Sequence, residues 1–320
     1  MTAFAASDKK TPPSDDPHGR MARANRRDTR TGLSFVAPWI VGFLIFTLYP
    51  ILASLYYSFC DYRVLSPPHW VGLRNYLDLF TDHDYFLQSL WNTAFMFIEL
   101  PIGLVLGLAI ALLLNQKLKG MAFFRTLYYV PSVVPTVASS ILWLWLLNPD
   151  YGLVNKTLAL LHLPHNFTWL NDRVWAKPGF IVMDLWSVGG GMIIYLASLQ
   201  GVPQYLYEAA DLDGASPWDK LRHVTIPSIS PVIFFNLILG VIGTFQYFTQ
   251  AFVMTGANGS VGGPANSTLF FSLYLYQNAF QYFRMGYACA MAWVLFIFTL
   301  IASAIVFKTS AGWVYYEGEK

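Results

Sequence analysis

Seven polar or aromatic side chains stand inside two long apolar stretches of the sequence, where they could hold a polar ligand through hydrogen bonds and ring contacts. These candidate binding residues are Asp184, Trp186, Ser187, Thr244, Gln246, Tyr247 and Gln250. Polar groups inside apolar helices are costly, so they mark transport pathways more often than chance would. They also hydrogen-bond one helix to another. Both interpretations stay open for each single residue, and the set as a whole predicts a binding region.

Catalytic chemistry is not expected in these apolar stretches. They contain no paired aspartates, no serine–histidine dyad and no histidines at metal spacing, because all six histidines lie outside them. Cys60 and Cys289 are far apart and match no metal or redox spacing, so we expect both to pack as small apolar residues. We therefore predict no enzyme activity, no metal site and no cofactor in this chain.

The composition is typical of an integral membrane protein. Of 320 residues, 55% are hydrophobic and 12% are charged, and the mean hydropathy is +0.44. Soluble domains carry about 25% charged residues. Six apolar runs are long enough to cross a bilayer core of about 30 Å as helices. They lie at roughly 35–59, 91–114, 126–147, 179–200, 229–254 and 286–307.

We therefore predict an all-α integral membrane protein with six transmembrane helices. Membrane strands are shorter and alternate in polarity, which these runs do not. The expected organisation is a disordered cytoplasmic tail over residues 1–32, a transmembrane domain over 33–310 and a cytoplasmic tail over 311–320. Fourteen Lys and Arg residues lie on the side of the termini and six on the other, which favours cytoplasmic termini. Half of the fourteen stand in the N-terminal tail.

The segment between the fourth and fifth runs, residues 203–227, is predicted to form two short helices at an angle. Pro203 suits the first turn of a helix, where its missing N–H costs nothing. Gly214 stands where a left-handed C-terminal cap is wanted, and Ser216 can cap the second helix. Pro227 is expected to break the chain before the fifth run.

The first of these short helices has the features of a docking surface. Ala209 and Ala210 leave one face nearly bare, so another backbone can approach closely. Glu208 offers a carboxylate to donors on a partner. By the charge count, this loop lies on the cytoplasmic side. An ordered polar segment in a chain that is mostly membrane span therefore predicts a cytoplasmic partner.

The same segment resembles the cytoplasmic coupling motif of ABC importer permeases. That motif is Glu-Ala-Ala, three residues, Gly, nine residues, an Ile-like residue, one residue and Leu-Pro. Here it reads Glu208-Ala209-Ala210, Gly214, Val224 and Ile226-Pro227, with two departures that keep an apolar branched side chain. Further stretches resemble the carbohydrate-importing branch of this family over about residues 35–307. They include 71–76, 92–93, 124–126, 152–155, 213–216, 262–264 and 286–288.

The resemblance implies a coupling helix between the fourth and fifth membrane helices that inserts into a cleft of an ATPase. The implied coupling residues are Glu208, Ala209, Ala210, Asp213, Gly214 and Pro227. The implied partners are a second homologous permease in a heterodimer, two ATP-binding subunits and an extracytoplasmic solute-binding protein, in the bacterial inner membrane and without nucleic acid. ATP and Mg belong to the ATPase chains, because no G-x-x-x-x-G-K-[S/T] loop occurs in this sequence.

The cargo implied by the resemblance is a carbohydrate, with an oligosaccharide favoured. Maltose permeases line their site from the fourth and fifth spans, and Trp186, Ser187, Thr244 and Tyr247 fall near those positions. The segments 38–43 and 142–145 resemble permeases of oligosaccharide importers, including those for uronates derived from pectin or alginate. A neutral oligosaccharide, a uronate oligomer and glycerol 3-phosphate all stay open.

Two further features allow two interpretations each. Glu99 precedes Pro101, so its carboxyl could bond locally around a proline kink or face the cavity. The run Gly189–Gly191 could mark a helix break that lines a transport site, or a close approach of a neighbouring helix. The alternative function is a passive channel or an ion-gradient-driven transporter that is not coupled to ATP.

Overall fold

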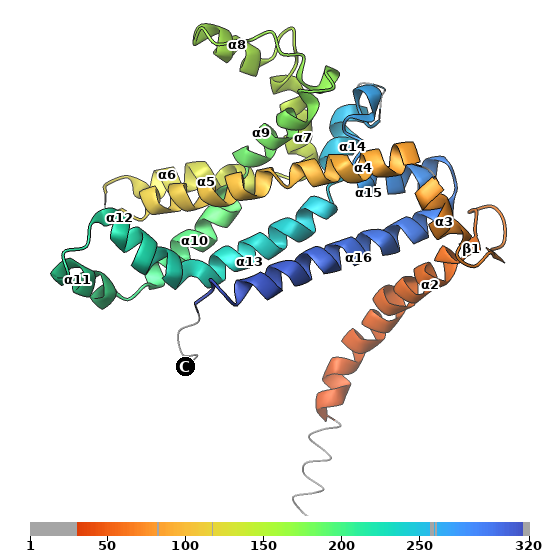
Figure 1. Cartoon of the computed structure of the whole chain (residues 1–320), viewed down its shortest axis with the longest axis horizontal. Helices are drawn as coiled ribbons and strands as arrows, with labels where there is room; N and C mark the ends of the chain where they lie inside the picture. Colours follow the sequence, from red (N-terminus) through yellow and green to blue (C-terminus); the bar gives the residue numbers. More distant parts are fainter. Residues whose placement is uncertain (1–30, 82, 117, 257–258, 260, 316–320) are drawn as a thin grey trace, which may run out of the picture. The chain divides into compact units, whose positions relative to one another are not determined.

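The computed structural model describes residues 31–81, 83–116, 118–256, 259 and 261–315, and most of these residues are helical (Figure 1). The predicted tail at 1–32 lies outside this range except for its last two residues, and so does the end of the predicted tail at 311–320. The chain divides into two compact units, one ending at Tyr56 and one beginning at Tyr57. The second unit contains every site discussed below.

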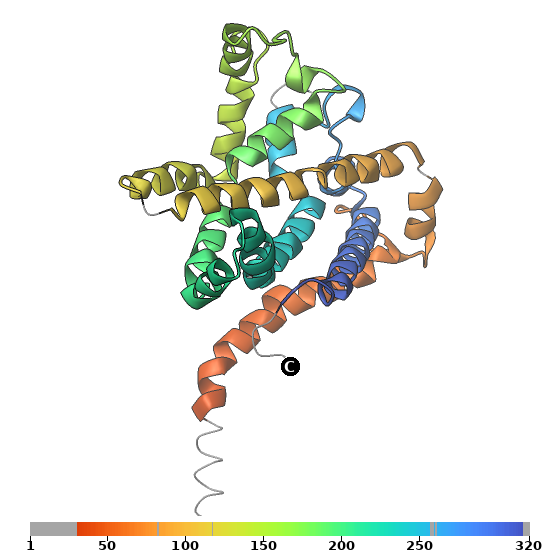
Figure 2. The same ribbon diagram turned by 60° about the vertical axis from the view of Figure 1, so that its left-hand side comes forward.

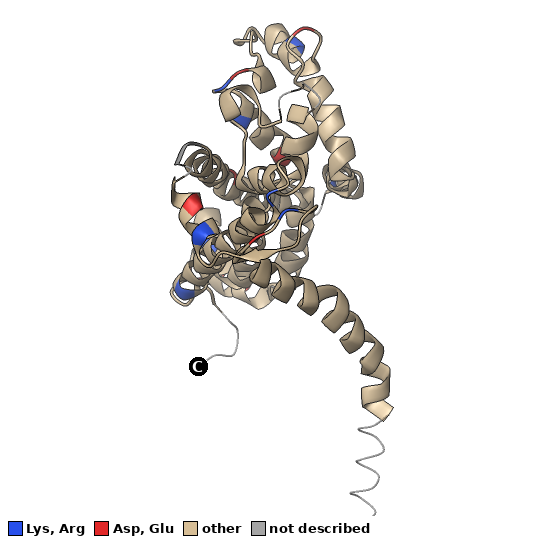
Figure 3. Cartoon of the chain, turned by 90° about the vertical axis from the view of Figure 1, so that its right-hand side faces the viewer, with Lys and Arg blue, Asp and Glu red and all other residues tan. Residues whose placement is uncertain are grey.

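Four helices are each long and apolar enough to cross a membrane: Thr31–Ser58, Tyr85–Leu114, Pro217–Phe245 and Met285–Ser310. Their shorter constituents are η1 (Leu44–Leu48), α2 (Tyr49–Ser58), α4 (His83–Met96), α5 (Glu99–Leu114), α12 (Pro217–Lys220), η3 (Leu221–Thr225), α13 (Ile226–Phe245) and α16 (Met285–Ser310). Lys, Arg, Asp and Glu are sparse along them, as Figure 3 shows. Many large apolar side chains on these helices are exposed, which suits contact with lipid.

Two predicted spans are bent pairs of helices instead of single rods. α6 (Met121–Val133) and α7 (Thr136–Leu146) meet at 99°, and α9 (Ala176–Trp186) and α10 (Gly189–Gly201) meet at 42°. The sharper bend follows from Pro135, because the residue before a proline is driven out of the helical region and Val134 is extended, with ψ 128°. The described residues therefore contain four membrane-capable segments, or up to six if each bent pair is one span.

The fifth predicted span, 229–254, is wrong as a single helix. α13 ends at Phe245, residues 247–248 are not helical, and α14 (Thr249–Gly256) is a separate helix. The Ser272 hydroxyl donates to the Phe245 carbonyl at 2.9 Å, so a side chain from another element satisfies a backbone group that the helix end leaves open. The interruption is thus stabilised by tertiary contacts that the sequence pattern does not show.

The remaining elements form connections at the helix ends. The short antiparallel strands β1 (Cys60–Asp61) and β2 (His69–Trp70) pair Cys60 with Trp70, a ribbon that the all-α prediction did not include. The other elements are α3 (Arg74–Thr81), α8 (Leu153–Leu160), η2 (Trp169–Asn171), α11 (Gln204–Leu212), η4 (Pro264–Asn266), α15 (Phe271–Tyr276) and η5 (Gln277–Gln281).

Two apolar clusters hold the second unit together. The larger joins α4, α7, α9, α14, α15 and α16 around fully buried rings such as Phe180, Phe270 and Phe271. The smaller joins α5, α10 and α13 around Met192, Tyr195 and Ile229. α13 and α16 lie side by side in both views of the chain (Figures 1 and 2), with the Phe234 and Phe307 rings edge to face at 5.1 Å.

Close packing at Gly189 joins α10 to α6. A Cβ built on Gly189 would lie 2.0 Å from the Tyr128 carbonyl oxygen, so only glycine allows this approach of the two backbones. The close-approach interpretation of the Gly189–Gly191 run is therefore confirmed at its first residue. The helix break of the other interpretation is also present, at residues 187–188 directly before it.

We expect Gly189→Ala to destabilise the protein, because overpacking costs about 1–3 kcal/mol and the obstacle here is backbone. The melting temperature of the purified protein in detergent should fall by about 5 °C. Gly201→Ala is the matched control on the same helix, where nothing lies within 4 Å of the added Cβ. Equal melting temperatures for the two variants would contradict the close contact.

Candidate functional site

A cluster of polar side chains surrounds the carboxyl group of Asp184 inside the helical bundle. The Tyr247 hydroxyl donates to Asp184 Oδ2 at 2.7 Å. The side chains of Glu99 and Gln250 lie beside the same carboxyl group. Four elements contribute: α5, α9, the link after α13, and α14. We call Glu99, Asp184, Tyr247 and Gln250 the Asp184 cluster.

Each member of the Asp184 cluster stands at or near an irregular point of its helix. Asp184 lies three residues before the break at 187–188, and Tyr247 lies in the link between α13 and α14. Glu99 follows a turn at 97–98 that precedes Pro101. Pro101 has no N–H for the Phe97 carbonyl, and the Leu100 N–H bonds to that carbonyl at 3.3 Å instead. Interruptions of three membrane-capable segments therefore meet at one group of polar side chains.

The cluster has both donors and acceptors at close range. Glu99 and Asp184 are two carboxyl groups close together inside an apolar bundle, where like charges are costly. The Tyr247 ring is buried and packs edge to face against Phe180 at 5.9 Å and Phe270 at 5.0 Å. The aromatic packing fixes the phenol, and the carboxyl and amide groups beside it can bond to a polar ligand.

The structure divides the seven predicted binding residues. Asp184, Tyr247 and Gln250 lie together. Glu99 lies beside them, a position that the proline-kink interpretation of Glu99 did not require. The other two hydroxyl residues bond to nearby backbone instead. Ser187 Oγ donates to the Asp184 carbonyl at 2.8 Å, and Thr244 Oγ1 donates to the Gly240 carbonyl at 2.9 Å. A second acidic residue in another apolar run was the sequence signal that could have paired Glu99 with Asp184.

The other two predicted binding residues lie elsewhere. Trp186 lines a largely apolar cavity of about 700 Å³ between α5, α6 and α9, and its ring packs against Trp143 at 6.1 Å. Gln246 is exposed at the end of α13. Neither residue lies in the Asp184 cluster.

The predicted docking segment is a rigid pair of short helices. α11 ends at Leu212 with Gly214 in the left-handed conformation, φ +73°. The Ala215 N–H bonds to the Ala210 carbonyl at 2.9 Å and the Gly214 N–H to the Asp211 carbonyl at 3.1 Å, the two bonds of a Schellman cap. Ser216 then begins α12 with a complete capping box to Asp219, as predicted for the cap residue.

Two side-chain contacts fix α11 against the start of the next membrane helix. The Tyr207 and Thr225 hydroxyls lie 3.0 Å apart, and Lys220 forms an ion pair with Asp211. Glu208 and Ala209 are exposed on the same short helix. The chain therefore presents a carboxylate and a small side chain on a helix whose position is set by contacts with its neighbours.

Pro203 and Pro227 differ from their predicted roles. Pro203 is the N-cap of α11, and the helix begins one residue later. Pro227 does not break the chain, because α12, η3 and α13 form one continuous helix, Pro217–Phe245. The π-helical turn η3 precedes the proline, with the Ile226 N–H bonding to the Leu221 carbonyl, and Thr225 Oγ1 bonds to the Lys220 carbonyl at 3.2 Å. This wider turn accommodates the proline that a regular helix would not.

The fold is that of a multi-helix protein with several membrane-capable helices, a buried polar cluster and an exposed short helix, α11. Residues 103–313 match the family model described as the binding-protein-dependent transport system inner membrane component. The chain belongs to this family. The resemblance to carbohydrate ABC importer permeases, drawn from the sequence, is confirmed.

Curated relatives and solved structures cover nearly the whole chain. The probable ABC transporter permease protein YesP of Bacillus subtilis (strain 168) is 38% identical over 94% of this chain and 97% of its own length. The lactose transport system permease protein LacF of Rhizobium radiobacter is 38% identical over 86% and 92%. A chain in the crystal structure of a bacterial ABC transporter involved in the import of the acidic polysaccharide alginate has a TM-score of 0.77 at 23% identity, covering 91% and 98%. The relatives are named as transport permeases, not as enzymes.

We expect Gly214→Ala to loosen the α11–α12 turn, because a left-handed φ costs an L-residue about 1–2 kcal/mol. Hydrogen exchange of the α11 amides should become about fivefold faster, while exchange in α13 stays unchanged. Gly201→Ala again serves as the control, since its backbone is right-handed and the space around it is open. Unchanged α11 exchange in Gly214→Ala would show that the cap does not limit opening.

Tyr247→Phe should destabilise the protein, because it removes a donor to a buried carboxyl group, at a cost of about 1–3 kcal/mol. A thermal unfolding curve in detergent measures the loss. Tyr205→Phe, at an exposed tyrosine of α11, should leave the curve in place. Identical unfolding curves for Tyr247→Phe and the wild type would show that this bond does not stabilise the folded protein.

Proposed function

We propose that this chain is a permease subunit of an ATP-driven ABC importer that moves a carbohydrate across the bacterial inner membrane. Membership of the binding-protein-dependent transport family supports the mechanism. The names of the relatives support the cargo, since they include permeases for lactose, for trehalose and maltose, and for arabinooligosaccharides. The chain covers 89% or more of each of these relatives.

The observation that carries this proposal is that α11 exposes a carboxylate and small side chains, while contacts with neighbouring elements hold the helix in place. In our proposal Glu208, Ala209, Ala210, Asp213 and Gly214 form the surface that enters a cleft of an ATPase subunit. Because α12 continues into α13 through η3, movement of the docked helix passes directly to a membrane helix. Closure of the ATPases on ATP would then tilt α13 and alternate the access of the central site.

The proposed topology has six membrane spans, with each bent helix pair counted as one span. It places both termini and the α11–α12 segment in the cytoplasm, in keeping with the excess of Lys and Arg on that side. The proposed complex contains a second homologous permease, two ATP-binding subunits that hold ATP and Mg, and an extracytoplasmic solute-binding protein. A solved relative of the fold was determined with an alginate pentasaccharide-bound periplasmic protein.

The Asp184 cluster is the proposed contact point for the sugar. Its carboxyl, amide and phenol groups match the hydroxyls of a carbohydrate, and they stand where three membrane-capable segments are interrupted. Interrupted helices at the centre of a transporter can change angle at the break, which is what alternating access requires. Trp186, Ser187, Thr244 and Gln246 stay candidate lining residues for a rearranged state of the transporter.

The alternative is a carrier driven by an ion gradient, which two neighbouring acidic residues inside an apolar bundle, Glu99 and Asp184, would suit. The two functions differ in their energy source. Uptake into proteoliposomes that hold the full complex should need internal ATP and persist when the ion gradients are collapsed. Uptake that continues without ATP would support the carrier.

Glu208→Lys should abolish ATP-coupled uptake while the complex still assembles, because it reverses the charge that faces the ATPase. We expect at least a tenfold lower uptake rate in proteoliposomes, with an unchanged elution volume of the purified complex. Asp150→Lys is the matched control, an exposed acidic residue on the predicted external side. An uptake rate of Glu208→Lys equal to that of the wild type would contradict the coupling role of α11.

A further inference from the structure

A second polar cavity, distinct from the Asp184 cluster, lies at the end of the bundle opposite the docking helix. Its volume is about 590 Å³, within the range of small-molecule sites. Its lining residues are Asp78, Thr81, Tyr85, Val261, Asn266, Leu269, Tyr274, Gln277, Asn278, Tyr282 and Arg284. None of them belongs to the Asp184 cluster.

The position of this cavity follows from α16. Arg284, at the cavity, directly precedes α16, and Tyr315, beyond the other end of α16, donates its N–H to Ser230 Oγ near the start of α13. The 26 residues of α16 span about 39 Å. Along the Tyr85–Leu114 helix, Tyr85 at the cavity and Glu99 in the cluster are separated by about 21 Å. In the proposed topology the cavity faces the outside of the cell.

One wall of the cavity is held by side chains of α4. Asn92 Nδ2 donates to the Asn266 carbonyl at 2.8 Å and to the Leu269 carbonyl at 3.0 Å, and Asn92 Oδ1 accepts from Lys177 at 2.9 Å. Thr93 Oγ1 accepts from the Phe271 N–H at 2.9 Å. The loop at 261–271 is therefore fixed to α4 by hydrogen bonds, and this wall is preformed.

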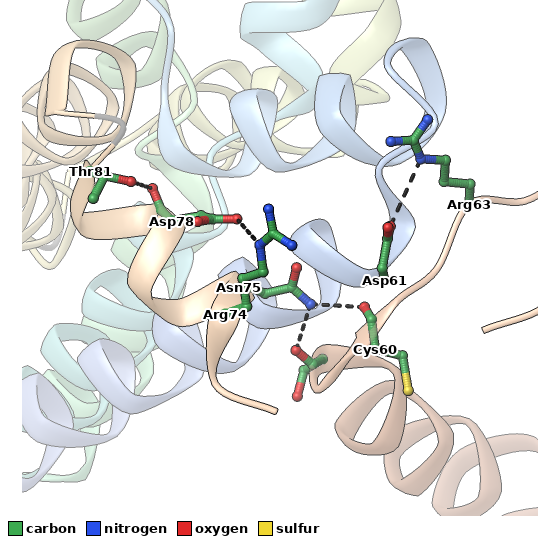
Figure 4. Close-up of polar contacts among 8 residues, drawn as sticks. Cys60, Asp61, Arg63, Arg74, Asn75, Asp78 and Thr81 are labelled. Carbon is green, nitrogen blue, oxygen red and sulfur yellow. Dashed lines mark hydrogen bonds and ion pairs between the residues drawn. The ribbon is translucent and has the colours of Figure 1, made fainter. Parts of the chain in front are cut away.

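The opposite wall is the turn after η5 together with α3. The Tyr282 N–H bonds to the Gln277 carbonyl and the Arg284 N–H to the Asn278 carbonyl, both at 2.8 Å. α3 is tied to the β1 strand by Asn75, whose Nδ2 donates to the Ser58 and Cys60 carbonyls, and Arg74 pairs with Asp78 at 4.0 Å (Figure 4). These contacts place Asp78 and Thr81 at the rim without help from a ligand.

The lining has the composition of a carbohydrate site. Tyr85 and Tyr274 lie with ring centroids 6.2 Å apart, and the Tyr85 and Tyr282 rings are 48% and 58% exposed, so they can stack on the C–H faces of a sugar. Asn266, Gln277 and Asn278 supply amides, which both donate and accept as hydroxyl groups require. An apolar ligand would offer no donor to the Asn278 amide oxygen, which is buried without a partner among the described groups.

Two lining groups have bonding capacity left over. Asn278 is almost fully buried, its Nδ2 donates to the Tyr274 carbonyl at 2.9 Å, and its Oδ1 has no hydrogen-bond partner among the described groups. Arg284 lies over the Tyr287 ring at 4.3 Å and takes part in none of the ion pairs found in the described part of the chain. A guanidinium group held this way can donate to sugar hydroxyls or to a uronate carboxylate.

We propose that this outer cavity is a second carbohydrate-binding site, at which an oligosaccharide first contacts the permease before it reaches the Asp184 cluster. The proposal rests on the proposed import function, and it names a site that the coupling and translocation steps do not need. Its ligand is an oligosaccharide that stacks on Tyr85 and Tyr282 and hydrogen-bonds to Asn278 and Arg284.

Direct binding tests the outer site. The complete complex in lipid nanodiscs, without solute-binding protein, is titrated with two fluorescent probes, labelled maltotetraose and a labelled tetrasaccharide of alginate. We expect at least one probe to bind, and the double variant Tyr85→Ala/Tyr282→Ala to bind it at least tenfold more weakly. Preference for the alginate probe that is lost in Arg284→Gln would assign a carboxylate to the guanidinium group.

A matched control variant tests whether the probe binds in the outer cavity. Tyr151→Ala removes a tyrosine that is as exposed as Tyr282 but lies outside this cavity, and it should bind the probe like the wild type. Probe binding that the double variant retains at wild-type affinity, or that is absent for both probes, overturns the outer site. ATP-dependent uptake by the same wild-type complex tests the import function separately.

Discussion

The second unit depends on one constraint: a backbone that is interrupted inside an apolar bundle must find other partners for its polar groups. Three membrane-capable segments are irregular near Glu99, Asp184 and Tyr247, and side chains from neighbouring elements meet there. The bond from Tyr247 to Asp184 joins the link after α13 to α9. Without such partners, each interruption would cost several kcal/mol in a lipid environment.

The same constraint explains why flexible points and polar points coincide in this protein. A helix that breaks gains the freedom to bend, and the polar side chains of the Asp184 cluster lie at or near such breaks. The Asp184 cluster is therefore both a candidate binding site and a place where the helices can bend. The α11–α12 segment differs from the cluster, because its helix caps and its contact with η3 restrict how its two helices can move.

Sequence reasoning predicted the helical class, the apolar runs and the capped docking segment, because these depend on local composition and on local hydrogen bonds. Gly214 and Ser216 have the backbone roles that their types require. The break after Phe245 was not predicted, because Ser272 from a distant element satisfies its carbonyl. The prediction that Pro227 breaks the chain was wrong, because the π-helical turn η3 accommodates the proline and no residue pattern predicts that turn. Glu99 was hard to place because its partner, Asp184, is 85 residues away in the chain.

The continuity of α12, η3 and α13 makes one lever out of three elements. A helix of 29 residues is about 43 Å long, so a tilt about one end displaces the other end in proportion to that length. A proline break at residue 227 would have absorbed much of such a rotation locally. Under the proposed coupling, the wider turn at η3 would therefore let a small rotation at the α12 end become a larger displacement at the Phe245 end, next to the Asp184 cluster.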